Sequence, residues 1–119
     1  MDQQMREKIE KIILDRKRAH KFYSEKSEVY NAFIKMENLT FIEGKLEKKN
    51  KELIAFGISI YRNCESCMEW HMKQALDSGA TSEQVLEAVN VAVEMGGGVA
   101  TVAARFAMHV LEYYTESHA

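Results

Sequence analysis

The chain has no proline, and it has only two cysteines and one tryptophan among its 119 residues. Proline is the residue that most often interrupts a helix, so its absence leaves helical segments uninterrupted and makes turns depend on glycine, asparagine and serine. No stretch shows the two-residue alternation that is typical of a strand. The sequence therefore predicts an all-α protein.

An excess of charge of either sign is also missing. Sixteen basic and eighteen acidic residues leave a net charge of -2, which gives no field to gather nucleic-acid phosphates or anionic lipids. No apolar run approaches the roughly 20 residues that span a membrane, and residues 1–8 lack the apolar core of a secretory signal. We expect a cytoplasmic protein with neither nucleic acid nor membrane as a partner.

The length fits one domain, residues 1–119, in which residues 1–40 form an N-terminal helical extension packing on the rest. The helical spacing of apolar residues predicts a bundle of about six helices. They cover residues 2–20, 27–36, 45 to about 62, 64–77, 81–95 and 99 to the carboxyl end. Thr81 and Gln84 form a capping-box pattern, and the glycines at 96–98 permit a sharp bend with close helix contact.

The two cysteines stand three positions apart, so they do not form the framework of separated cysteines that staples a secreted scaffold. On a helix, Cys64, Cys67 and His71 fall within one narrow arc. A thiol in the first turn faces unpaired amides, which favour its thiolate, and a neighbouring thiol can resolve an oxidised one. His71 can accept or relay a proton, and Glu52 on the preceding helix can orient it if the two helices are antiparallel.

Two other interpretations of these residues remain open at this stage. The cysteines can be small core residues, which is the usual role of a lone buried cysteine. Alternatively, Cys64, Cys67, His71 and Glu52 supply four potential zinc ligands, although structural zinc more often draws on two separated Cys/His pairs. The lysine-rich run at 45–51 is most simply a solvated helix face.

The order and spacing of several further signals resemble the carboxymuconolactone decarboxylase family in its alkylhydroperoxidase D-like branch. The resemblance covers about residues 45 to 110, and the signals that carry it are Glu52, Cys64-x-x-Cys67-x-x-x-His71, Gly79-Ala80-Thr81, Glu83 and the run Glu94-Met95-Gly96-Gly97-Gly98.

The resemblance implies an all-helical protein that assembles into homo-oligomers, either trimers or hexamers. In the peroxide-reducing branch, the position of Cys67 is the attacking thiol that is oxidised to sulfenic acid, and the position of Cys64 is the proton donor and resolving thiol. His71 and Glu52 match the proton relay. Electrons come from a dithiol donor such as a lipoylated protein, and a peroxiredoxin is a further partner. Ser66 departs from the family pattern, which often has His or an aromatic residue there.

The expected function is therefore that of a thiol-dependent peroxidase or disulfide oxidoreductase. It uses no bound cofactor beyond a redox-active Cys64–Cys67 disulfide, and no bound metal. The lactone decarboxylases of the family generally lack such a pair, so its presence favours thiol chemistry. A decarboxylase-like lyase and a zinc-stabilised, non-enzymatic module are the alternatives.

Overall fold

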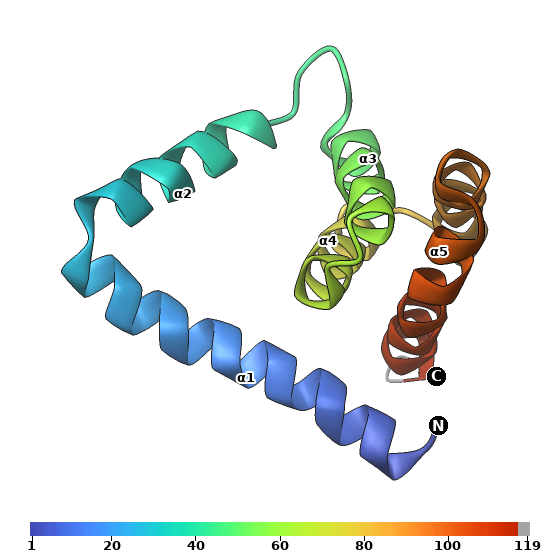
Figure 1. Cartoon of the computed structure of the whole chain (residues 1–119). Helices are drawn as coiled ribbons and strands as arrows, with labels where there is room; N and C mark the ends of the chain where they lie inside the picture. Colours follow the sequence, from blue (N-terminus) through green and yellow to red (C-terminus); the bar gives the residue numbers. More distant parts are fainter. Residues whose placement is uncertain (117–119) are drawn as a thin grey trace.

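A computed structural model describes residues 1–116 of the chain, and 117–119 lie outside the described part. Within residues 1–116 the chain forms five helices and no strand: α1 Gln3–Lys26, α2 Glu28–Thr40, α3 Lys48–Tyr61, α4 Glu65–Asp77 and α5 Ser82–Glu116 (Figure 1). The all-α prediction is confirmed. The helix count is one lower than the expected six because the two helices expected on either side of the triple glycine are joined as α5, with a non-helical kink at Gly97.

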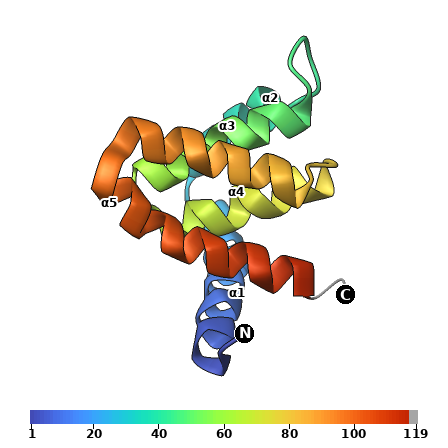
Figure 2. The same ribbon diagram turned by 90° about the vertical axis from the view of Figure 1, so that its right-hand side faces the viewer.

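The glycine run bends α5 sharply. Gly97 has φ +66° and ψ -147°, a conformation that other residues rarely adopt, and Figure 2 shows α5 as two arms that meet at this point. A Cβ atom at Gly96 would lie 2.6 Å from the Cβ of Ala100 and 3.3 Å from the Tyr61 ring. The predicted bend and close helix approach are therefore present.

By length and composition α5 is apolar enough to cross a membrane, which the sequence analysis did not expect. Both of its arms nevertheless contribute to the core. Ten residues of α5, from Val85 on the first arm to Tyr114 on the second, are buried. They belong to the same core as the fully enclosed Phe56 of α3 and Met72 of α4. Only 22% of the most apolar window of α5 is buried, so packing inside the molecule explains just part of its apolar character.

The first two helices differ in how they attach to this core. α1 inserts Ile9, which is fully buried, whereas α2 has no buried residue and its backbone closely approaches only α1. Ser27 ends one helix and caps the next, because its hydroxyl accepts the amide hydrogen of Tyr30 at 3.0 Å. α1 thus runs to residue 26 and α2 to residue 40, beyond the predicted ends at 20 and 36.

A fully buried carboxylate, Glu69 of α4, joins α1 to the carboxyl-terminal arm of α5. Arg16 of α1 forms an ion pair with it, and the hydroxyl of Tyr114 donates a hydrogen bond to it. The Arg16 guanidinium also lies over the Trp70 ring at 4.8 Å. Burial, together with the hydrogen bond to Glu69, raises the pKa of Tyr114 well above its ordinary value.

Candidate active site

The turn between α3 and α4 fixes the backbone of the first cysteine. The amide of Cys64 donates to the carbonyl of Ser59 at 2.9 Å, and that of Asn63 donates to Ile60 at 3.0 Å, the two bonds of a Schellman motif. Asn63 takes the left-handed conformation with φ 54°, which asparagine tolerates better than most residues. The residue that completes the cap of α3 is therefore Cys64.

Cys64 is also the N-cap of α4. Its sulfur accepts the amide hydrogen of Cys67 at 3.2 Å, in the way that a serine or aspartate oxygen caps most helices. The two sulfurs are joined in a disulfide with a Cα–Cα distance of 5.2 Å. Cys67 is an exposed residue, whereas Cys64 is half-buried.

One turn further along α4, His71 lies against α3. Its Nδ1 is 2.8 Å from Oε1 of Glu52, and the other carboxylate oxygen is 2.6 Å from Nζ of Lys48. The side chain of Glu52 is only 3% exposed, whereas that of His71 is 16% exposed. Because a carboxylate only accepts hydrogen bonds, the hydrogen lies on Nδ1, and Nε2 remains available for proton transfer.

The segment that follows α2 covers this pair. The ring of Phe41 is 5.4 Å from that of His71, and the ammonium of Lys48 lies 5.9 Å from the Phe41 ring. Lys51 holds the segment on α3 by donating to the carbonyls of Thr40 at 3.0 Å and Ile42 at 2.7 Å. A cavity of about 450 Å³ lies beside the cover and reaches Glu52 and Trp70.

The structure thus brings the predicted residues together in two pairs. Cys64 is bonded to Cys67, and His71 is hydrogen-bonded to Glu52. Among the interactions of residues 1–116, none is a hydrogen bond between His71 and a sulfur, so a proton passing between the pairs needs a water molecule or a bound substrate as a bridge. No group of three or more Cys, His, Asp or Glu side chains is gathered for a metal within this range.

Sequence reasoning missed three residues that contribute to the site. The lysine run was expected to be a solvated face, but Lys48 pairs with Glu52 and Lys51 anchors the cover. Lys48 and Glu52 are four residues apart on one helix, a spacing that predicts an ion pair between them. Phe41 carries no such signal, because its contact with His71 joins segments far apart in the chain.

Comparison with known proteins identifies relatives of this chain. The model of the carboxymuconolactone decarboxylase family matches residues 27–109, more than half of the chain. An uncharacterised protein of the cox locus in Paracoccus denitrificans is 40% identical over 82 residues, which are 69% of this chain and 74% of that protein.

Two further proteins extend the comparison. The alkyl hydroperoxide reductase AhpD of Corynebacterium kroppenstedtii is 36% identical over 52 residues, which are 44% of this chain but only 30% of that protein. A crystal structure from Thermotoga maritima, of a family protein with a suggested part in an antioxidative response, superposes with a TM-score of 0.84. It is 26% identical, and the match covers 91% of this chain and 92% of that one.

Proposed function

This chain belongs to the carboxymuconolactone decarboxylase family, with alkylhydroperoxidase D-like relatives, and from that premise we propose that it is a thiol-dependent peroxidase or disulfide oxidoreductase. The observation that carries the proposal is the position of the cysteine pair. Cys64 and Cys67 lie close enough to bond at the start of a helix, and Cys67 is an exposed residue. That arrangement suits a thiol that is repeatedly oxidised and reduced.

In the oxidative half of the cycle, the thiolate of Cys67 attacks the terminal oxygen of a hydroperoxide. The O–O bond breaks, Cys67 becomes a sulfenic acid, and the alkoxide takes a proton and leaves as an alcohol. The thiolate of Cys64 then attacks the sulfenic sulfur, which forms the disulfide and releases hydroxide, protonated to water. Two electrons pass from the two thiols to the peroxide.

His71 and Glu52 serve as the proton relay of this cycle. Nε2 of His71 accepts the thiol proton of Cys67 and returns a proton to the departing oxygen, through a water molecule or the substrate itself. The buried carboxylate at 2.8 Å holds the ring in one tautomer and stabilises its protonated form. Lys48 occupies the second oxygen, so the carboxylate keeps a single orientation.

In the reductive half, a dithiol donor such as a lipoylated protein restores the pair. One donor thiolate attacks the sulfur of Cys67, Cys64 leaves as a thiolate, and the second donor thiol closes the donor disulfide. The amide that already donates to the Cys64 sulfur stabilises that leaving thiolate. A peroxiredoxin partner that passes its own disulfide to this pair fits the same chemistry, as does a reducing, cytoplasmic setting.

The test mixes fully reduced protein with an organic hydroperoxide and follows both peroxide consumption and the number of free thiols. We expect two thiols to be lost per peroxide, and Cys67→Ser to abolish consumption. Cys64→Ser should still consume one equivalent but stop at the sulfenic acid, which a dimedone probe traps. Ser66→Ala is the matched control, because it alters an exposed side chain between the two cysteines. Undiminished peroxide consumption by Cys67→Ser would contradict the proposal.

A further inference from the structure

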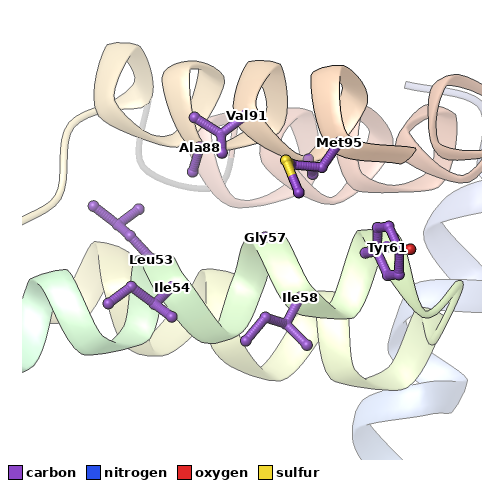
Figure 3. A pocket seen from close by; sticks show the side chains of 9 residues that line it. Leu53, Ile54, Gly57, Ile58, Tyr61, Ala88, Val91 and Met95 are labelled. Atoms are coloured by element: carbon purple, nitrogen blue, oxygen red, sulfur yellow. The ribbon is translucent and has the colours of Figure 1, made fainter. Parts of the chain in front are cut away.

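Cavities lie on two faces of α3, and one of them borders the reactive groups. A cavity of about 470 Å³ lies between α3 and the first arm of α5, and Figure 3 shows the uncharged side chains that line it. The cavity of about 450 Å³ beside the cover, here called the cover cavity, is instead lined by Glu52 of the relay, by Phe41 and by Trp70. Its volume is that of a pocket for a small organic molecule.

The cover cavity extends along the face of α4 that carries the attacking thiol. Trp70 and Gln74, which line it, follow Cys67 by three and seven residues, a spacing that places all three on one face of a helix. The cavity therefore begins about 4.5 Å beyond Cys67 along the helix axis. The Phe41 ring that lines it also lies 5.4 Å from the ring of His71. A molecule in the cavity can thus direct a reactive end toward the imidazole and the thiol.

The charged groups of the cover cavity are mostly acidic. The carboxylates of Glu37, Glu43 and Glu52 and the ammonium of Lys48 line it, so three negative charges and one positive charge leave a formal charge of -2. Glu52 is engaged on one oxygen by Lys48 and on the other by His71. One oxygen of Glu43 accepts the amide hydrogen of Lys48 at 3.2 Å. A ligand therefore meets negative charge with little cation left to balance it.

Glu37 is the acid of this set without a partner. It is half-buried near the end of α2, and within residues 1–116 its carboxylate forms neither a hydrogen bond nor an ion pair. The side-chain amides of Asn38 and Gln74, also on the cavity wall, are likewise without a hydrogen bond in this part of the chain. Arg16 of α1, whose guanidinium lies over an aromatic ring of the wall, is already paired with the buried Glu69. It does not offset the charge of Glu37.

We infer that the cover cavity receives the organic part of a hydroperoxide, and that Glu37 makes it select uncharged molecules over carboxylates. The rings of Phe41 and Trp70 supply the contact surface for an alkyl or aromatic body. A carboxylate bound about 6 Å from that of Glu37 would lose affinity on the order of ten-fold at an effective dielectric constant of about 40. The same repulsion disfavours the alternative lyase function, because a decarboxylase must bind a carboxylate. Only the identity of the bound molecule as a hydroperoxide rests on the proposed function.

The first experiment measures binding without any reaction. Benzyl alcohol, benzoate and benzylamine share one ring and differ in charge at neutral pH. Each is titrated into the oxidised protein, and the fluorescence of Trp70, the only tryptophan and a residue of the cavity wall, reports binding. We expect benzoate to bind about ten-fold more weakly than the alcohol, and benzylamine, as its cation, to bind at least as tightly as the alcohol.

Variants at position 37 assign the preference to its carboxylate. Glu37→Gln should narrow the difference between alcohol and benzoate to about three-fold or less, and Glu37→Lys should reverse it. Glu94→Gln is the matched control, since Glu94 is an exposed acid of α5 outside the cavity wall, and it should keep the ten-fold difference. Circular dichroism checks that all three variants keep their helix content. Equal affinity for alcohol and benzoate in the unsubstituted protein would overturn the inference, as would an unaltered preference in Glu37→Lys.

The second experiment repeats the comparison with peroxides. Cumene hydroperoxide and its para-carboxylate derivative oxidise the reduced protein, and each rate is divided by the rate with free dithiothreitol to remove intrinsic reactivity. The neutral peroxide should be favoured about ten-fold, and the advantage should fall to about three-fold in Glu37→Gln. Oxidation of both peroxides at equal relative rates would contradict the inference and leave the proposed function standing. Failure to react with either peroxide would contradict the proposed function, and the binding experiment would still decide the role of Glu37.

Discussion

Two buried carboxylates, Glu52 on α3 and Glu69 on α4, have contrasting surroundings. Glu69 is fully enclosed, and both of its oxygens are taken by groups that serve no reaction, the guanidinium of Arg16 and the hydroxyl of Tyr114. One carboxylate oxygen of Glu52 accepts a hydrogen bond from Lys48, and the other is hydrogen-bonded to the partly exposed imidazole of His71. A buried carboxylate whose two oxygens are both bound by structural groups stabilises the fold. A buried carboxylate whose hydrogen-bond partner is partly exposed can take part in proton transfer.

The largest expected effect comes from removing Arg16, the ion-pair partner of Glu69. Arg16→Met leaves the Glu69 carboxylate buried without its counter-ion, so we expect a loss of about 3 kcal/mol or more in the free energy of unfolding, measured by urea titration. Lys8→Met is the control, because it breaks an exposed ion pair with Glu65 and should cost less than about 1 kcal/mol. Equal losses in the two variants would show that Glu69 is not held as described.

The second test exchanges the two acids for their amides. Glu52→Gln should slow oxidation of the reduced thiols by an organic hydroperoxide about 100-fold, the usual contribution of a positioned proton-transfer group. Glu69→Gln should leave that rate within about two-fold, after correction for any unfolded fraction. Stopped-flow measurement on both proteins gives the answer. A comparable slowing of thiol oxidation in Glu69→Gln would show that the two acids do not differ in their contribution to the reaction.

A third test uses alkaline pH. Burial first, and the hydrogen bond to Glu69 second, raise the pKa of Tyr114, so the folded state prefers the neutral phenol. That stabilisation is fully present below the ordinary tyrosine pKa of about 10 and is lost as pH rises above it. Tyr114→Phe should therefore lose about 1–2 kcal/mol at neutral pH and show a shallower decline above about pH 10.

Part of the alkaline decline should persist in Tyr114→Phe. The pKa of Tyr113 is also raised, by burial and by the neighbouring Glu10. Urea titrations across the alkaline range on both proteins measure the difference in slope. A variant whose stability falls as steeply as that of the unsubstituted protein would show that Tyr114 does not carry the effect.

The smallest expected effect concerns Glu52, the buried acid whose histidine partner is partly exposed. Lys48→Met removes the cation from the second oxygen of Glu52, but the lysine side chain is 36% exposed and water can replace its ammonium. We expect the peroxide rate to fall by no more than a few-fold, with Lys49→Met as the neighbouring control. A loss as large as that of Glu52→Gln would make Lys48 an essential part of the relay.

Much of the fold was predictable because it is encoded locally. The capping box at Thr81 and Gln84 forms as expected, with reciprocal bonds of 3.0 and 3.1 Å, and the bend falls within the glycine run. The antiparallel packing of α3 and α4 that sets Glu52 against His71 was stated as a condition, and the short turn at Asn63 provides it. Each of these features depends on residues close together in the sequence.

The rest depends on contacts between distant segments. The pair of Arg16 with Glu69 joins positions 53 residues apart, and nothing in the local pattern marks Glu69 as buried. The exposure of the apolar residues Val29, Phe33, Met36 and Leu39 on α2 could not be predicted either. The sequence of an amphipathic helix does not show which of its apolar residues face the core of the same chain. The roles assigned to Cys64, Cys67, His71 and Glu52 remain predictions until the thiol assays are made.

Cys64 ends one helix and begins the next, and the backbone bond that places it, from its amide to Ser59, does not involve its sulfur. Closing or opening the link to Cys67 therefore leaves the turn pinned at the same point. We expect the oxidised and reduced forms to differ in structure only at the turn between α3 and α4, and the two helices to keep the same positions in both forms. A donor protein would then bind a surface of the same shape in every catalytic cycle.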